Sequence, residues 1–228
     1  MQNLYENIPD ILKQRQNWVA WGIRDAPPKS PFNPASLLAG RPFPAKAGVK
    51  ETWSSYENAA ECVSRGIAQG IGYEFDGGVY GVDLDHVIDE TGTLTPQAQE
   101  IVGKLASYTE ISPSGTGLHI FVFAPGADIT RHRKKDYFLE IYNEGRYFTV
   151  TGNVFDGGRN IETRTAELQA VHDKYQFCEL LDVGKSTGYK LLKSSRVRGF
   201  KIGKVWKVPV KSVERFVTAS VNLLERIS

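Results

Sequence analysis

Cysteine is scarce in this chain of 228 residues, which holds only Cys62 and Cys178. The two form no CxxC pair, so the sequence indicates neither a zinc ribbon nor a disulfide framework. No apolar run is long enough to cross a bilayer, and the first residues lack the pattern of a secretory signal. We therefore expect a cytoplasmic protein that contacts no membrane.

The charged residues are unevenly distributed along the chain. From Lys174 onward there are twelve Lys or Arg and four Asp or Glu, a net charge of +8. The part before it holds the other 16 of the 28 basic residues and the other 22 of the 26 acidic residues, a net charge of −6. An acidic body followed by a basic segment predicts two modules, the second a candidate for nucleic-acid contact. A solvated basic face is the alternative.

The most informative short stretch is YGVDLDHVID, at residues 80–89. Side chains alternate between the faces of a strand, so Asp83 and Asp85 point to one side and Val82 and Leu84 to the other. Two carboxylates this close repel each other unless a cation lies between them, and hard oxygen ligands suit Mg²⁺ or Mn²⁺. The alternative is a strand that ends in an aspartate-rich turn.

A turn rich in serine and glycine, SPSGTGLH, follows at residues 112–119. Small residues let backbone N–H groups approach an anion closely, as phosphate-binding loops do. The candidate phosphate ligands in this turn are Ser112, Ser114, Gly115 and Gly117. His119 opens the next strand and is placed to touch a phosphate, although a lone strand histidine is more often structural.

The stretch FLEIYNEGRYFTVTG contains an acidic and a basic candidate. Glu140 is flanked by apolar residues, and an unpaired buried carboxylate is costly, so this position requires a cation or a hydrogen-bond donor. The guanidinium of Arg146 suits a phosphate, and Lys29 in the upstream Pro- and Gly-rich loop is a lesser candidate. A water-facing glutamate on an edge strand and a surface arginine on a hairpin are the alternatives.

Turn and cap signals outline the secondary structure. The glycine-bearing turns at 76–78 and 143–145 are each predicted to join two strands as a hairpin. Capped helices are predicted over residues 52–66 and 95–107. Residues 25–50, rich in Pro, Gly and Lys, are predicted to form a long loop.

The order DLD, SPSGTGLH, then LEIY with GRYFTVTG resembles the archaeo-eukaryotic primase superfamily, and more narrowly the primase-polymerase domains of phages and plasmids. The three motifs of that family match Asp83 and Asp85, then Ser114 to His119, then Glu140. The resemblance implies an α+β fold for residues 1–165. An RRM-like primase-polymerase core would carry the motifs, with an N-terminal α/β unit packed beside it.

The same resemblance implies template-dependent nucleotidyl transfer, as DNA primase, DNA polymerase or both, in the replication of a phage, plasmid or other mobile element. Asp83, Asp85 and Glu140 would be the catalytic residues and would hold two Mg²⁺ or Mn²⁺ ions. The candidate phosphate ligands would bind a ribo- or deoxynucleoside triphosphate, and single-stranded DNA would be the template. The sequence contains no GxxxxGK[ST] signature, so a separate helicase would supply any unwinding.

The basic segment has a pattern of its own. A helix over residues 166–174 is expected to link the modules, and KSTGYKLL is predicted to be the second helix of a helix-turn-helix, followed by a two-stranded wing, GFKIGKVWKVP. The segment resembles the excisionase or MerR type of winged helix-turn-helix domain over about residues 174–220, and the domain is expected to cover residues 175–228. The residues expected to contact duplex DNA are Lys185, Ser186, Thr187, Tyr189, Lys190, Arg198, Lys201, Lys204 and Lys207. A small basic bundle for protein contact is the alternative.

Two other functions stay open. The chain could be a non-catalytic DNA-binding regulator or replication initiator, with a first module that is inactive or only senses nucleotide. A relaxase- or nuclease-type initiator is disfavoured, because such enzymes typically need an HxH pair and His132 has no second histidine two residues away.

Overall fold

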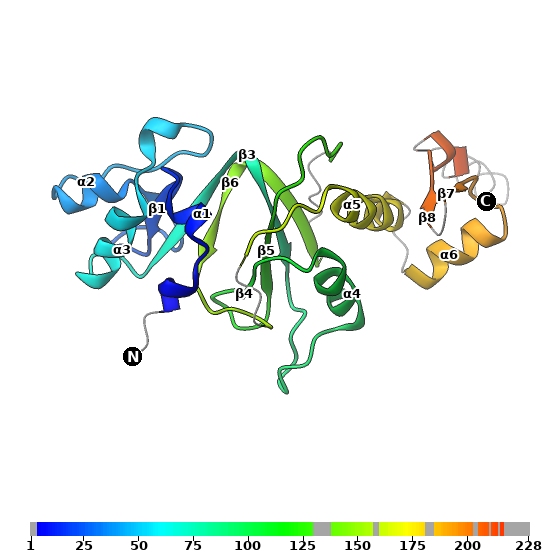
Figure 1. Cartoon of the computed structure of the whole chain (residues 1–228), viewed down its shortest axis with the longest axis horizontal. Helices are drawn as coiled ribbons and strands as arrows, with labels where there is room; N and C mark the ends of the chain where they lie inside the picture. Colours follow the sequence, from blue (N-terminus) through cyan, green and yellow to red (C-terminus); the bar gives the residue numbers. More distant parts are fainter. Residues whose placement is uncertain are drawn as a thin grey trace, which may run out of the picture.

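The computed structural model describes residues 4–129, 138–156, 160–180, 185–202, 205–209, 211–213 and 215–216. The fold is α+β and is built on one antiparallel sheet of six strands, with a separate two-stranded sheet near the C-terminus. Two long strands, β3 (Gly70–Leu84) and β6 (Leu139–Val150), belong to both halves of the large sheet. They meet at the top of Figure 1, where the ribbon that they form bends between the two halves.

The N-terminal half of the sheet has the order β2-β1-β3, with β6 on the other side of β3. Its elements are η1 (Leu4–Asn7), α1 (Asp10–Lys13), β1 (Trp18–Trp21), β2 (Pro31–Phe32), α2 (Pro34–Leu38), η2 (Lys50–Thr52) and α3 (Tyr56–Ser64). The Ser55 side chain caps α3 by accepting a hydrogen bond from the Asn58 N–H, as the sequence predicted. The segment expected as a long loop at 25–50 also contains two short elements, β2 and an α2 that Asn33 caps.

The central half of the sheet has the order β6-β3-β5-β4. Its other elements are α4 (Pro96–Leu105), β4 (Thr109–Ile111), β5 (Leu118–Val122) and α5 (Thr165–Leu180). One face of this half packs against α4 and α5 through a buried apolar cluster that includes Val82, Ile120 and Leu168. An antiparallel sheet with helices on one face is consistent with the primase-polymerase core that the sequence predicted.

The two predicted hairpins are wrong. Each turn signal lies inside one continuous strand, and both runs on either side of it pair with the same partner strand in one direction. The pairing register of β3 and β6 shifts at these two turn signals, which lie opposite each other because Asp76 pairs with Glu144. The positive φ angles of Gly77 and Gly145 permit the ribbon to bend there. Arg15 and Lys50 form ion pairs of 3.5 and 3.0 Å with Asp76, which fix the bend.

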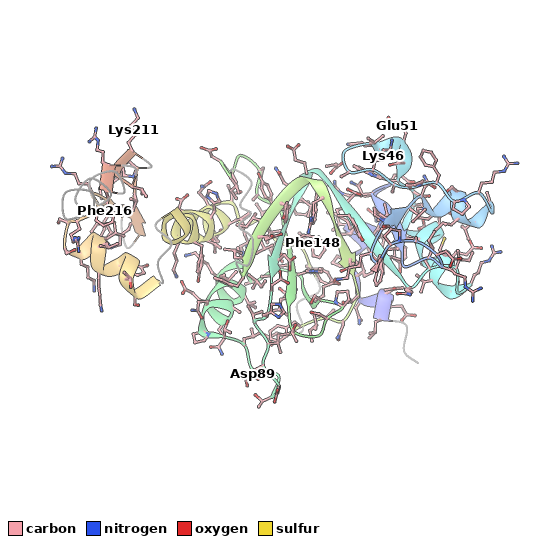
Figure 2. The ribbon with its side chains drawn as sticks, turned by 180° about the vertical axis from the view of Figure 1, so that it is seen from behind. Lys46, Glu51, Asp89, Phe148, Lys211 and Phe216 are labelled. Carbon is pink, nitrogen blue, oxygen red and sulfur yellow. The ribbon has the colours of Figure 1, made fainter. Side chains whose placement is uncertain are left out.

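Because the ribbon bends, aromatic side chains from both halves meet between its arms. The ring of Phe121, on β5 of the central half, lies 5.9 Å from that of Phe75 and 6.0 Å from that of Phe148, which belong to the N-terminal half. A Cβ at Gly81 would lie 2.2 Å from the Phe75 ring, so this close approach needs glycine. Figure 2 shows Phe148 between the two arms.

The C-terminal part consists of α6 (Lys185–Lys193), β7 (Phe200–Ile202) and β8 (Val205–Lys207), and it lies beyond α5 in Figure 1. It has a small buried cluster of its own, formed by Leu191, Leu192, Val197 and Val213. The helix expected at 166–174 lies within α5, which continues through residue 180, and Tyr175 is buried in the central cluster. The expected turn at 182–184 lies outside the described residues.

None of the helices in the described ranges is both long enough and apolar enough to span a membrane.

Candidate functional site

Four ionisable side chains line up across the central half of the sheet. Asp83 on β3 pairs with Glu140 on β6 and with His119 on β5, and His119 pairs in turn with Glu110 on β4. Residues directly opposite each other on antiparallel strands point to the same face. The row therefore consists of Glu140, Asp83, His119 and Glu110, on the face opposite to α4 and α5.

Asp83, in the middle of the row, is electrostatically strained. Its side chain is 17% exposed, and burial raises its pKa to about 6. The charges of Asp85 and Glu140 raise the pKa further, while His119 and Arg146 act in the opposite direction. The ionised form of Asp83 thus lacks part of the positive charge that would balance it.

The other two predicted carboxylates lie close to Asp83 along the two strands. Asp85 is exposed just past the end of β3, where its N–H donates a 2.8 Å hydrogen bond to the Phe138 carbonyl oxygen next to the start of β6. Glu140 is partly buried, and its Oε2 accepts a hydrogen bond from the Tyr142 hydroxyl. Tyr142 therefore orients Glu140, a contact that the sequence did not predict.

These three carboxylates fit a divalent cation by the chemistry of their donor atoms. Oxygen ligands suit Mg²⁺ or Mn²⁺, and a cation would offset the burial and the mutual repulsion that together raise the pKa of Asp83. In the conformation described, Asp83 faces His119 and Glu140 faces Tyr142. The described ranges accordingly hold no ready-made cluster of three or more His, Cys, Asp or Glu donors.

The ring of His119 is fixed from three sides. Its Nδ1 donates a 2.9 Å hydrogen bond to the Thr149 carbonyl, and the ring stacks on Phe148 at 4.7 Å. The Nε2 atom then points towards Asp83, at 3.7 Å from Oδ1. Burial alone would lower the pKa of His119, but the nearby carboxylates of Glu110 and Asp83 outweigh it and raise the pKa. The raised pKa makes the protonated ring easier to form than in a free imidazole, and a protonated ring suits contact with an anion.

Glu110 ends the row and was not predicted from the sequence. It is fully buried; its Oε1 accepts from the Thr151 N–H, and its Oε2 accepts from the Gly152 N–H, both at 3.0 Å. The Tyr108 hydroxyl also donates to Oε2, at 2.8 Å. Glu110 thus holds the chain after β6 against β4 and lies 3.7 Å from His119 Nδ1. The sequence feature that could have indicated Glu110 as a site residue is its position as an acidic residue within a short strand.

A cavity of about 420 Å³ opens beside the row. The structure brings Lys29 and Arg146, both predicted to bind phosphate, into its walls together with Asp83 and His119. Lys29 adopts a positive φ of 57°, and its carbonyl oxygen accepts a hydrogen bond from the Tyr147 hydroxyl. The complete described lining is Lys29, Pro31, Ala47, Glu74, Asp83, His119, Gly145, Arg146, Tyr147, Phe148 and Thr149.

The serine- and glycine-rich turn lies elsewhere, at the Asp85 end of β3. The Thr116 carbonyl accepts hydrogen bonds from the N–H groups of Val87 and Ile88, at 2.8 and 3.0 Å. A Cβ at Gly117 would lie 2.8 Å from the Leu84 carbonyl oxygen, so the turn packs tightly on the strand end. The described cavity lining contains none of its predicted ligands, namely Ser112, Ser114, Gly115 and Gly117.

A second unpredicted carboxylate, Glu74, belongs to the cavity wall. The side chain is 0% exposed, and no described residue hydrogen-bonds to either of its carboxylate oxygens. Burial raises its pKa to about 7, from an ordinary value of 4.5. Glu74 is therefore costly to ionise in the folded chain.

Replacing Glu74 by glutamine is expected to stabilise the fold in a pH-dependent way. The pKa of the Glu74 carboxyl is higher in the folded than in the unfolded chain, so its ionisation destabilises the fold. This destabilisation is absent below about pH 4.5 and complete above about pH 7. Denaturant unfolding should show that Glu74→Gln gains about 1–3 kcal/mol at pH 8 and much less at pH 4.5. The control is Glu57→Gln, since Glu57 on α3 is exposed. A stability gain of Glu74→Gln that does not depend on pH would contradict the prediction.

The described DNA-contact candidates of the basic segment are on its surface. Those with exposed side chains are Ser186, Thr187, Tyr189, Lys190, Arg198 and Lys201. Leu191 and Leu192 of α6 face inward, so the helix has one apolar and one polar face. Lys185 and Lys207 belong to α6 and β8, and Lys204 lies outside the described residues.

Comparison with known proteins gives one informative match. No protein-family model matches the chain. Over 164 residues, which are 68% of this chain, it is 36% identical to a protein of Nitratiruptor phage NrS-1 named DNA primase-polymerase. The chain spans only 22% of the length of that relative. This similarity supports the primase-polymerase family for the chain whose sheet carries Asp83, Asp85 and Glu140.

Proposed function

We propose that this chain transfers nucleotides to DNA under the direction of a single-stranded template, as a primase, a polymerase or both. The observation that carries the proposal is the row of Glu140, Asp83 and His119 beside a cavity that Lys29 and Arg146 also line. Carboxylates for cations and basic groups for phosphates are the two requirements of nucleotidyl transfer. The name of the phage relative supports the same activity.

The basic side chains would bind the nucleoside triphosphate. Arg146 offers a bidentate guanidinium and Lys29 an ammonium, while His119, whose pKa is raised, would contribute a third positive group when protonated. The ring of His119 cannot turn away freely, since Thr149 and Phe148 hold it. A fixed donor needs little reorganisation when a phosphate binds.

The acidic side chains would hold two divalent cations. Asp83, Asp85 and Glu140 are the proposed ligands, and Tyr142 would orient Glu140. When bound, Mg²⁺ or Mn²⁺ would stabilise negative charge on the attacking and leaving oxygens. The other role proposed for the chain is to position the nucleoside triphosphate next to the 3′-hydroxyl of the growing strand.

A primer-dependence assay tests this function. The full chain is incubated with a single-stranded template, labelled nucleotides and Mg²⁺ or Mn²⁺, with and without a primer. Products without a primer indicate a primase, and products only with a primer indicate a polymerase. No product under either condition, in the presence of divalent cations, would favour the non-catalytic regulator. A reaction with chelator is the control.

A second activity, duplex DNA binding, is proposed for residues 175–228. Two observations favour it: a separate buried cluster beneath α6, and exposed polar and basic side chains on the outer face of that helix. A helix of this kind suits the major groove, and the lysines of β7 and β8 suit phosphates. Such binding would place the catalytic part near a DNA site used in the replication of a mobile element.

A further inference from the structure

Glu74 has no role in the function proposed above, yet its environment is unusual. It is completely buried, and neither carboxylate oxygen has a hydrogen-bond partner among the described residues. Buried polar groups are nearly always hydrogen-bonded, and one that is not requires an explanation. A ligand group that enters the cavity and donates a hydrogen bond would provide it.

The position of Glu74 limits which ligand group this can be. Glu74 on β3 pairs directly with Tyr147 on β6, and Arg146 is the next residue along β6. The Tyr147 ring lies over Gly72, where a Cβ would be 2.4 Å from ring atom Cδ2, and its hydroxyl binds the Lys29 carbonyl oxygen. Glu74 and Arg146 both line the same cavity, which places Glu74 near the proposed phosphate-binding arginine.

The chemistry of a carboxylate selects among the parts of a nucleotide. Phosphate oxygens accept hydrogen bonds and carry negative charge, so they would be repelled by Glu74. The donors of a nucleoside triphosphate are its sugar hydroxyls and the amino and ring N–H groups of its base. The sugar is bonded directly to the phosphates, so it is the part that lies next to the group that Arg146 and Lys29 would bind.

We propose that Glu74 accepts a hydrogen bond from a sugar hydroxyl of the nucleotide in this cavity. The inference rests on the proposed function, because it assumes that the cavity binds a nucleoside triphosphate. It adds a specificity determinant that recognises the sugar, separate from the basic groups that recognise the phosphates.

The test compares the full-length parent and Glu74→Leu by equilibrium titration in Mg²⁺. The probes are dATP, dCTP, 2′,3′-dideoxy-ATP, which has neither sugar hydroxyl, and inorganic triphosphate, which has no sugar. Glu74→Leu should bind both deoxynucleotides about tenfold more weakly or worse, since a hydrogen bond to a charged group is lost. For the dideoxy analogue, and likewise for triphosphate, the affinities of the parent and of Glu74→Leu should agree within about twofold.

Thermal unfolding accompanies the titrations. Glu74→Leu should melt at a higher temperature than the parent at pH 8, because an unpaired buried carboxylate is replaced by an apolar side chain. Weaker binding by a more stable protein separates loss of a ligand contact from loss of structure. The exposed Glu57→Leu is the matched control and should bind every probe like the parent. Glu74→Gln, which keeps one acceptor oxygen, is a second variant and should show a smaller loss.

Several results would overturn the assignment. If the parent and Glu74→Leu bound dATP with equal affinity, Glu74 would not contact the nucleotide. If Glu74→Leu also bound the dideoxy analogue or triphosphate more weakly than the parent, the contact would not be with a sugar hydroxyl. A loss confined to dATP or to dCTP would show that Glu74 reads the base. A parent that binds no nucleotide would overturn the proposed function itself, whereas a parent that binds normally leaves that function intact whatever Glu74 does.

Discussion

Replacing Asp83 by asparagine is expected to lower nucleotide incorporation by at least about a thousandfold, which corresponds to roughly 4 kcal/mol of transition-state stabilisation. Asp83 lies between Glu140 and His119 in the sheet, so it is the carboxylate that links the proposed cation ligands to the proposed triphosphate site. Asparagine has the same shape but carries no charge. The measurement is primer extension on a single-stranded template at saturating nucleotide and Mg²⁺.

The same substitution should leave the fold intact or make it more stable. Burial and the charges of Asp85 and Glu140 raise the pKa of Asp83, so ionised Asp83 destabilises the folded chain in the absence of cations. Unfolding at pH 7.5 without divalent cations should therefore occur at an equal or higher denaturant concentration in Asp83→Asn. An activity loss accompanied by a clear loss of stability would instead assign a structural role to Asp83.

The matched control for Asp83→Asn is Asp89→Asn. Asp89 is exposed in a loop that projects from the body of the protein in Figure 2, and it accepts hydrogen bonds from Thr91 and Thr93. It follows Asp85 closely in the sequence but lines no wall of the cavity described above. Incorporation by Asp89→Asn should match that of the parent. If Asp83→Asn kept more than about a tenth of the parental rate, the proposed catalytic role of Asp83 would be wrong.

The sequence predicted the face of the strand on which Asp83 lies better than it predicted the path of the backbone. Alternation along a strand placed Asp83 away from the apolar side chains of Val82 and Leu84, and the sheet has the same arrangement. The glycines at 76–78 and 143–145 were predicted to reverse the chain. That prediction was wrong, because a local pattern cannot distinguish a hairpin from a bend. The pairing partner, about seventy residues away, decides between them.

The unpredicted residues depend on contacts between segments that are distant in the sequence. Glu110 and Glu74 show the same pattern as Glu140, an acidic residue in an apolar strand, but neither belongs to a motif. Two of the partners of Glu110 are N–H groups some forty residues away, and the carboxylate of Glu74 accepts no hydrogen bond from a described residue. The position of the predicted candidate Lys29 in the cavity wall likewise depends on a distant contact, since its carbonyl oxygen accepts a hydrogen bond from the Tyr147 hydroxyl. Spacing along the chain contains no information on such contacts.

The second large effect is expected from removal of the basic segment. A chain that ends at Leu180 should bind duplex DNA about a hundredfold more weakly than the full chain at 100 mM salt, because it lacks most of the segment whose net charge is +8. The cut is placed after 180 because α5 is continuous to that residue and Tyr175, only 3% exposed, belongs to the central cluster. Incorporation on single-stranded template should stay within about twofold of the full chain.

The physical nature of this binding can be tested through its dependence on salt. Each phosphate contact releases counterions, so the logarithm of affinity should fall with the logarithm of salt concentration with a slope of about −0.9 per contact. Lys201→Ala, on the exposed side of β7, should weaken binding to all duplexes alike and flatten this slope by about one unit. Thr187→Ala, on the exposed face of α6, should instead change the preference among sequences, since that face would meet base edges. Duplex binding that is insensitive to salt, or that the truncated chain retains in full, would contradict the assignment of DNA binding to this segment.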